Sequence, residues 1–448
     1  MTTTEWKSDF RPGVVGAANL GDPVADWARS GVVALTGRPD GPPLVPPGHA
    51  ASVAGELASQ FAALTGVRVD GARLLSERAA FTGHKRRGSV SAGGACRLLP
   101  TADGWAAISC ARPDDPALLG ALVGEDVGDD PWPAVTRWLS GHTGAELRER
   151  ADLLGVAAAP VRRAVTAPAV SQAAIPLPPA PAQRPVPARP AAPRPLAGLL
   201  VADFSALWAG PLCAHLLGLA GARIVKVETP WRPDGARRGN AAFYRLLHAG
   251  HRSVAFDPLT SAGREAMAAL VRAADIVIES SRPRALARFG LDADAAVAAG
   301  TTWVSITAYG RAVDRVGFGD DVAAGAGLVA ADADGHPLFC GDAIADPLTG
   351  LTAALLAARA PAGGVLLDVA MSGVVAATLD TATTATRPVA RARRPPSARR
   401  SWDVDADEWV ADTASGPVPV AMPRRRLVPG KAPGLGEHTA EVSAELGI

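Results

Sequence analysis

The chain is poor in cysteine and aromatic residues and carries almost no net charge. Its 448 residues include four Cys, none in C-x-x-C spacing, which argues against a disulfide framework and favours a reducing, cytoplasmic setting. A net charge of +1 gives no strong field for nucleic acid or a membrane surface. The sequence shows no apolar leader and no apolar run long enough to span a bilayer, so we expect no membrane association.

Proline is abundant and marks the clearest boundary in the chain. Residues 166–197 form a Pro- and Ala-rich linker, in which repeated Pro removes backbone donors and fixes φ. The linker separates a module at 1–165 from a larger unit at 198–385. An Arg- and Pro-rich stretch, 386–408, is predicted to be a flexible connector to a closing tail at 409–448.

The larger unit alternates strand and helix patterns, which predicts an open, largely parallel sheet. An apolar strand run at 199–204 is followed by a turn at 209–211 that begins a helix, and by a second strand at 223–228. In such βαβ units the loop after the first strand binds ligands. The loop has no G-x-G-x-x-G pattern, so a dinucleotide is not indicated.

Several segments resemble, in order, those of the class III CoA-transferase family, which includes formyl-CoA transferase, carnitine CoA-transferase and α-methylacyl-CoA racemase. Residues 274–283 resemble A-D-V-V-I-E-N-F-R-P and residues 344–351 resemble I-A-D-L-x-x-G-L. Further similar segments are 203–211, 251–257, 304–310 and 429–439. The resemblance implies an α/β fold, with a Rossmann-like open parallel sheet domain plus a smaller α+β domain.

The N-terminal module is similar to a different part of the same family. Residues 34–43 resemble the segment before the family's nucleophile, and residues 100–108 and 153–161 resemble the two ends of its small domain. The resemblance implies a rearranged domain order, in which the N-terminal module supplies the small domain that the C-terminal part lacks. Aligning Gly55 with Gly350 places Ala51 opposite Asp346, so this module is predicted to lack a nucleophile.

The resemblance makes Asp346 the candidate nucleophile, which would attack an acyl-CoA thioester. A carboxylate at a strand-to-helix turn is positioned, partly desolvated and close to backbone N–H donors. On spacing alone, an Asp before a helix is more often its N-cap, so we also expect Asp346 to cap the following helix. Asp320 stands where the racemase branch has a His, and an Asp needs a large pKa shift to exchange protons near neutral pH.

Coenzyme A is expected as a cosubstrate, with no tightly bound cofactor and no metal. The resemblance assigns CoA binding to residues on four segments: Leu207, Trp208, Ala209, His251, Arg252, Ser280 and Arg288. Gly93 and Gly94 resemble a glycine-rich lid, and glycine pairs suit mobile loops. The histidines show no metal-ligand spacing and are predicted to be isolated: His49, His84, His215, His248 and His438.

The predicted function is transfer of CoA between an acyl-CoA and a free carboxylic acid through an aspartyl-CoA thioester. Two alternatives stay open: racemisation of a 2-methylacyl-CoA, and acyl-CoA binding without catalysis. The expected partners are an acyl-CoA, a small carboxylic acid and, by resemblance, a second copy in a homodimer, with no nucleic acid and no membrane.

Overall fold

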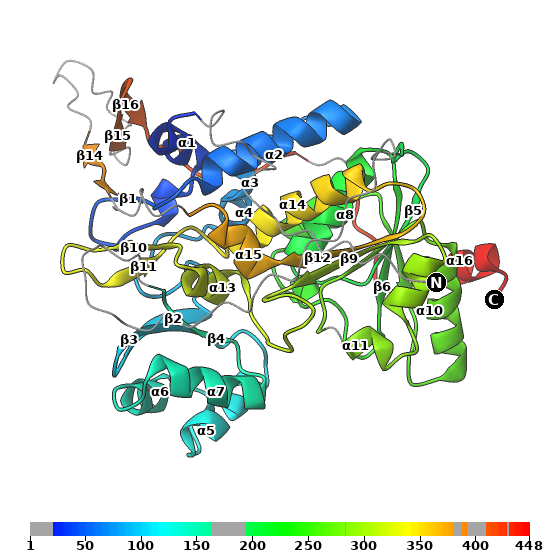
Figure 1. Cartoon of the computed structure of the whole chain (residues 1–448), viewed down its shortest axis with the longest axis horizontal. Coiled ribbons are helices and arrows are strands. Elements are labelled where there is room, and N and C mark those ends of the chain that lie inside the picture. Colours follow the sequence, from blue (N-terminus) through cyan, green and yellow to red (C-terminus); the bar gives the residue numbers. More distant parts are fainter. Residues whose placement is uncertain (1–20, 163–193, 283, 380–386, 392–408, 428–429) are drawn as a thin grey trace, which may run out of the picture.

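The computed structural model describes residues 21–162, 194–282, 284–379, 387–391, 409–427 and 430–448. Most of the predicted linker and connector, 166–193 and 392–408, therefore lies outside the described residues. The described part contains a six-stranded sheet domain, a smaller antiparallel sheet with three helices, and a helical segment that precedes both in sequence (Figure 1).

The central sheet is parallel throughout and is doubly wound, as the strand and helix pattern predicts. Its spatial order is β12-β9-β8-β5-β6-β7. The chain builds β5, β6 and β7 outward on one side of β5, then returns to build β8, β9 and β12 on the other. The strands are β5 (Leu200–Asp203), β6 (Arg223–Glu228), β7 (Arg252–Ala255), β8 (Ile276–Glu279), β9 (Thr302–Thr307) and β12 (Val365–Ala370).

Both faces of this sheet are buried, which explains why its strands read as continuous apolar runs. Successive strand residues alternate between two cores, so Ile276 and Ile278 face one core while Val277 faces the other. The first core is covered by α8 (Ala209–Leu219) and α14 (Ala345–Arg359). On the opposite side lie α10 (Ser261–Ala273), α11 (Arg284–Ala287), α12 (Ala293–Ala298) and α16 (Thr439–Leu446) (Figure 1).

The N-terminal residues contain the smaller α+β unit. Strands β2 (Cys96–Thr101), β3 (Gly104–Ser109) and β4 (Ala158–Pro160) form an antiparallel sheet. Three helices cover it around a core of its own: α5 (Asp115–Val123), α6 (Trp132–Leu139) and α7 (Gly144–Leu154). The fold is therefore α/β with a parallel sheet and smaller antiparallel sheets, as predicted.

The helices that precede this unit pack directly on the large domain. They are α1 (Pro23–Ser30), α2 (Ala50–Thr65), α3 (Gly71–Leu74) and α4 (Glu77–Thr82). Leu57 and Phe61 of α2 share one continuous core with Leu348 and Leu351 of α14. Buried apolar contact thus joins the N-terminal residues to the sheet domain.

The remaining elements connect these layers. They are α9 (Ala241–His248), α13 (Gly319–Ala326), β10 (Val329–Ala331), β11 (Pro337–Phe339) and α15 (Met371–Ala376). Within the predicted connector, β13 (Arg387–Pro388) pairs with β1 (Leu44–Val45), and β14 (Ala390–Arg391) pairs with β15 (Trp409–Thr413), which continues to β16 (Gly416–Pro419). The tail thereby returns to the N-terminal helices.

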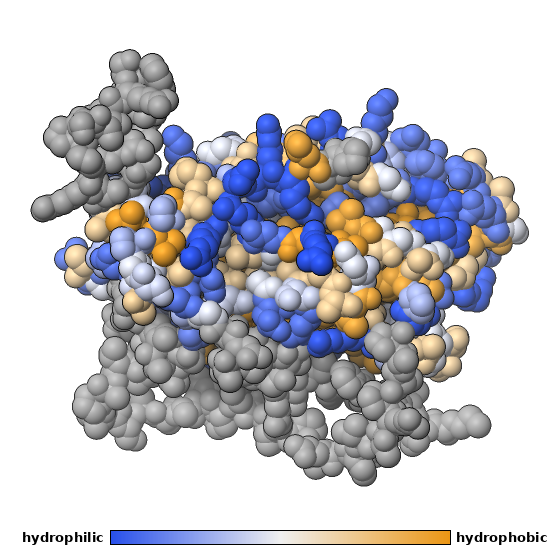
Figure 2. Space-filling view, turned by 90° about the horizontal axis from the view of Figure 1, so that it is seen from above, coloured by the Kyte–Doolittle hydropathy of each residue, from blue (hydrophilic) through white to orange (hydrophobic). Residues whose placement is uncertain are grey.

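The face seen from above mixes hydrophilic residues with small scattered hydrophobic patches (Figure 2). None of the helices within the described ranges is both long and apolar enough to cross a membrane. The expected homodimer stays a prediction.

Candidate functional site

The order in which strands are added to the sheet reverses between β5 and β8, and a loop follows each of these parallel strands at the same edge. The backbone N–H of Ala206, after β5, donates to Ser280 Oγ, after β8, at 3.0 Å. Leu207 adopts a left-handed backbone conformation with φ 68°, and its N–H donates to Asp234 Oδ1 at 3.0 Å. Doubly wound sheets bind ligands at this point, and a strained non-glycine residue there is typical of functional sites.

The residues predicted to bind CoA separate into two groups. Leu207, Trp208 and Ala209 lie together with Ser280 at the β5–β8 edge; Leu207 is exposed, and buried Trp208 packs edge-to-face against Phe243. Arg288 is exposed in the turn after α11.

His251 and Arg252 are not brought to this edge. His251 is buried beside His248, and Arg252 pairs with Glu441 and Glu445 of α16. Arg252 is in register with Val225 of β6, two strands away from β5. Their role in CoA binding stays a prediction.

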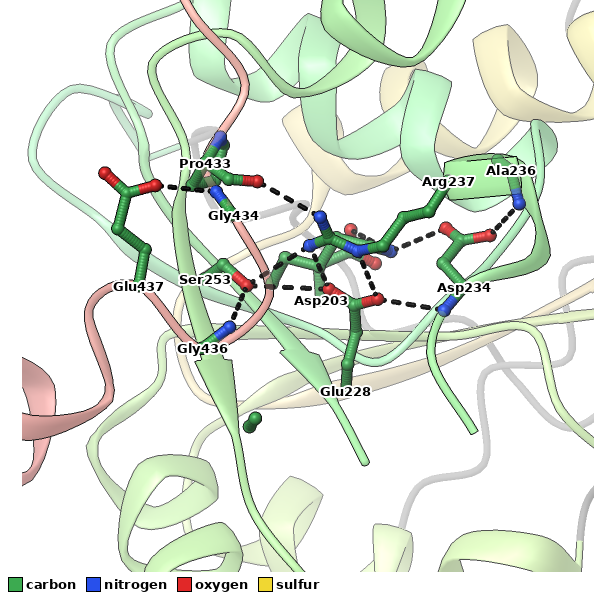
Figure 3. A network of polar contacts seen from close by, with 12 residues as sticks. Asp203, Glu228, Asp234, Ala236, Arg237, Ser253, Pro433, Gly434, Gly436 and Glu437 are labelled. Carbon is green, nitrogen blue, oxygen red and sulfur yellow. Dashed lines mark hydrogen bonds and ion pairs between the residues drawn. The ribbon is translucent and has the colours of Figure 1, made fainter. Parts of the chain in front are cut away.

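A buried ionic network supports the loop after β5 (Figure 3). The ammonium group of Lys226, fully buried, donates to the Ser205 carbonyl at 2.8 Å and lies 3.0 Å from Asp234 Oδ2. Arg237 binds Glu228 Oε2 at 2.5 Å and the Pro433 carbonyl of the C-terminal tail at 3.1 Å. Such charges need partners when buried, so the network fixes the shape of the predicted CoA loop.

Asp346 lies at the start of α14, which covers the same face of the central sheet as α8. The helix begins at Ala345 and its N-cap is Ile344, so the expectation that Asp346 caps the helix is wrong. Ala343 adopts φ 47°, which turns the chain sharply before α14 and places Asp346 inside the first helical turn. Its carboxylate, half-buried, is therefore free of a capping role.

The Asp346 carboxylate faces the start of α13. A Cβ at Gly319 would lie 2.6 Å from Asp346 Oδ2, so only glycine leaves room for this side chain. Asp320 and Asp321 follow in the first turn of α13, and Asp320 Oδ1 accepts from the Ala343 N–H at 2.8 Å. Two helix starts thus converge on one cluster of carboxylates.

A fourth carboxylate, Asp342, is bound from the N-terminal module. It is fully buried, and Arg78 of α4 donates to it from Nε at 2.9 Å and Nη2 at 2.5 Å. His84 Nδ1 lies 3.3 Å from Asp342 Oδ1, a contact that the sequence did not indicate. The Arg78 guanidinium also lies 5.1 Å from the centre of the Trp208 ring.

Burial and the Arg78 charge give the four carboxyl groups of this cluster different pKa values. Desolvation raises the pKa of Asp346 to about 7, with Asp320, Asp321 and Asp342 adding to the rise and Arg78 opposing it. Desolvation, then the Asp342 charge, raises the pKa of Asp320 to about 6. The pKa of Asp342 falls well below its usual range because Arg78 outweighs its burial. Desolvation also raises the pKa of Asp321 to about 7. The site therefore combines one firm ion pair with carboxyl groups that titrate near neutral pH.

The predicted lid lies at this cluster. A Cβ at Gly93 would lie 3.6 Å from Arg78 Nη2 and 3.9 Å from Asp342 Oδ1. Gly94 takes φ 84° in a turn closed by its N–H to the Ser91 carbonyl at 2.8 Å. The Ser91 hydroxyl opposes the rise in the pKa of Asp320. Whether the loop moves stays a prediction.

Sequence reasoning missed Arg78, which is the basic partner of the cluster. It follows Glu77 in a short helix, and adjacent opposite charges are typical of a solvated surface. Residues 78 and 342 are 264 positions apart, so no local pattern connects them.

Two other features lie away from Asp346. A cavity of about 390 Å³, lined partly by Glu279, Trp303 and Arg311, lies on the face covered by α11 and α12. Asp332, Asp334 and His336 bring ligand atoms within 4.8 Å of one another, but Asp332 already accepts from Arg38 and from backbone N–H groups. Neither feature is assigned a ligand.

Fold and site together define a doubly wound α/β protein with a carboxyl group of raised pKa at a helix start. Residues 196–439, more than half of the chain, match the model of CoA-transferase family III. The chain belongs to this family.

Among its relatives, succinate–glutarate CoA-transferase of Agrobacterium fabrum is 32% identical over 212 residues, 41% of this chain and 53% of the relative. Formyl-CoA:oxalate CoA-transferase of Escherichia coli is 33% identical over 103 residues, 21% of this chain and 25% of the relative. The chain thus spans about half the length, or less, of these curated relatives.

Two solved structures are also similar. A CAIB/BAIF family protein from Brucella suis matches at 29% identity and TM-score 0.37, over 41% of this chain and 55% of its own. The hypothetical protein Rv3272 from Mycobacterium tuberculosis matches at 28% identity and TM-score 0.37, over 42% and 56%.

Proposed function

We propose that the protein transfers CoA from an acyl-CoA to a free carboxylic acid, with Asp346 as the nucleophile. The observation that carries this proposal is the half-buried Asp346 carboxylate, held inside the first turn of α14 rather than capping it. Its pKa of about 7 leaves a substantial fraction ionised at neutral pH. The family provides the reaction class.

In the first half of the reaction, an Asp346 oxygen attacks the thioester carbonyl and the C–S bond breaks. The CoA thiolate leaves and a mixed anhydride remains on Asp346. The thiolate then attacks the aspartyl carbonyl, which releases the donor acid as its carboxylate and forms an aspartyl-CoA thioester. No water or redox partner is consumed.

The second half repeats these steps with the acceptor. The acceptor carboxylate attacks the aspartyl thioester and expels the CoA thiolate. That thiolate attacks the acceptor acyl carbonyl, so the new acyl-CoA leaves and the Asp346 carboxylate is regenerated. Covalent catalysis of this kind divides one difficult transfer into easier steps.

In this proposal the loop after β5 positions CoA beside Asp346. A Cβ at Gly350 would lie 2.5 Å from the Ala209 carbonyl, which shows how closely the starts of α14 and α8 approach. A thioester that reached the cluster from the β5–β8 edge would pass Trp208 and Arg78. The N-terminal module would then complete the site, as the rearranged domain order implies.

The test is CoA exchange by the full chain. We expect purified protein to move CoA from a panel of acyl-CoAs to a panel of small carboxylic acids. Mass spectrometry of the new acyl-CoAs measures this exchange. Asp346→Asn should abolish exchange, whereas Asp294→Asn, at an exposed carboxylate of α12, should not. Retained exchange in Asp346→Asn would contradict the proposal.

A second candidate is exchange of the α-proton of an acyl-CoA. The sequence argued against it because Asp320 replaces a His, but the pKa of Asp320 rises to about 6 beside Asp346. Two carboxyl groups that titrate near neutral pH can remove and return a proton. Deuterium incorporation at the α-carbon in heavy water, without CoA exchange, would favour this function.

A further inference from the structure

The cluster around Asp346 presents an electrostatic problem for the proposed reaction. The charges of three further carboxyl groups, Asp320, Asp321 and Asp342, act on Asp346, the residue that an anionic acceptor must approach. Like charges at close range in a partly desolvated site repel strongly. An acceptor carboxylate therefore needs a cationic group within reach of Asp346.

Arg78 has the geometry for this task. Its Nε and Nη2 atoms both bind Asp342, which fixes the plane of the guanidinium. The third nitrogen, Nη1, makes no hydrogen bond to any residue in the described ranges, and a quarter of the side chain is exposed. Since a guanidinium carries five donors in a rigid fork, one edge can hold Asp342 while another binds a second oxyanion.

The surroundings keep this guanidinium charged and accessible. Its charge interacts with both Asp320 and Asp346. Trp208 supports it from the side of the predicted CoA loop. Gly93 lies next to the guanidinium, and a Cβ at this position would be 3.6 Å from Nη2, so the glycine leaves space beside Arg78.

We propose that Arg78 of the N-terminal module receives the carboxylate of the acceptor acid through Nη1, while Asp342 and Trp208 hold its guanidinium beside Asp346. This inference rests on the proposed CoA transfer and adds the residue that would select an anionic acceptor. It gives a role to the module that is predicted to lack a nucleophile: through Arg78, this module brings a positive charge to the carboxylate cluster.

Binding is tested first without chemistry. Succinate is titrated into Asp346→Asn in the presence of CoA, and its affinity is measured by saturation-transfer NMR. Adding Arg78→Met to this variant should weaken succinate binding by roughly tenfold or more, the loss expected for one charge-assisted hydrogen bond. Adding Arg137→Met, at an exposed arginine of α6, should change nothing. An unchanged affinity in the Arg78 variant, or no binding to Asp346→Asn itself, would overturn the inference.

Turnover then separates the inference from the proposed function. In an otherwise wild-type chain, Arg78→Lys should raise KM for the acceptor acid by roughly tenfold and leave KM for the acyl-CoA nearly unchanged, because Lys keeps the charge but not the fork. If Arg78→Lys raised KM for the acceptor acid and KM for the acyl-CoA equally and also lowered the melting temperature, Arg78 would have a structural role instead. Succinate binding that depends on Arg78 in a chain without CoA exchange would contradict the proposed function alone.

Discussion

At the scale of single residues, opposing effects act on Asp346. Asp346 lies in the first turn of α14, where the helix dipole favours a negative charge. Desolvation and three neighbouring carboxyl groups favour the neutral form, and they win, so the pKa rises to about 7. A carboxylate poised in this way gains nucleophilicity without being locked into an ion pair.

Replacing this carboxylate tests its role with little change of shape. We expect Asp346→Asn to lower CoA exchange by several orders of magnitude, because the amide cannot form the anhydride. The melting temperature should not fall, since the substitution removes a buried charge that no residue in the described ranges binds by a salt bridge. A chain that unfolds on this change would show that Asp346 is structural.

The pH dependence follows from the same residue. Asp346 must be ionised to attack, so the rate of its acylation should rise with pH and level off above about pH 7. The groups facing it are Arg78, Asp320, Asp321 and Asp342. Asp320→Asn should move the midpoint to lower pH, because it removes a charge that raises the Asp346 pKa. A flat profile between pH 5 and pH 8 in rapid-quench measurements would contradict this.

The sequence identified Asp346 and the loop of Leu207 and Trp208 as candidates, but not the residues that surround them. Residues in motifs can be recognised from the sequence because they lie next to turns and strand ends, which have local sequence patterns. Arg78 and His84 were missed because their partner, Asp342, is reached only after α4 packs on the sheet domain. The N-cap expectation failed because the chain turns at Ala343 and the N-cap is Ile344, two residues before the expected Asp346.

At the scale of elements, the approach of α14 to α8 positions Asp346, the proposed nucleophile. A Cβ at Gly350 would lie 2.5 Å from the Ala209 carbonyl and 3.0 Å from Leu212 Cβ. Gly350→Ala should therefore lower the free energy of unfolding by about 1–3 kcal/mol, because backbone must shift to admit the methyl group. Chemical denaturation measures this change.

The matched control is a helical glycine with room around it. A Cβ at Gly373 of α15 would find its first neighbour at 3.8 Å. Gly373→Ala should stabilise the chain by about 0.5–1 kcal/mol through helix propensity. Equal effects at the two glycines would show that the α14–α8 contact is looser than described.

The βαβ unit was predictable as a set of elements. The expected strand at 223–228 matches β6, and the expected helix after Ala209 matches α8. A short apolar run bounded by turn signals indicates a buried strand when its length is too small for a helix. The position of α2 against α14 was not predictable, because an amphipathic pattern shows which face is buried and not what covers it.

At the scale of the whole molecule, the returning tail connects the N-terminal helices to the sheet domain. Arg426 binds both carboxylate oxygens of buried Glu77 at 2.8 Å and lies 3.3 Å from His215 of α8. Arg426→Ala should lower the free energy of unfolding by about 2–3 kcal/mol, because it leaves a buried carboxylate unpaired.

The exposed pair of Arg137 with Glu125 provides the comparison. Arg137→Ala should change stability by less than about 1 kcal/mol. If the two substitutions had the same small effect in denaturant titrations, the tail would contribute little to holding the two parts together.

Composition and strand alternation predicted the parallel sheet and a linker-separated N-terminal module. They did not predict that the two parts share one core, since Leu57 and Leu348 meet only in the folded chain. The proposed cooperation of the two modules therefore rests on the described contacts of Arg78 and Asp342.

The most direct test of the account is to trap the covalent intermediate. The full chain is incubated with a mixture of acyl-CoAs, treated with hydroxylamine and mapped by peptide mass spectrometry. The account predicts a hydroxamate on Asp346, since both its anhydride and its CoA thioester react with hydroxylamine. An unmodified Asp346 in a chain that binds acyl-CoA would contradict covalent catalysis by this residue.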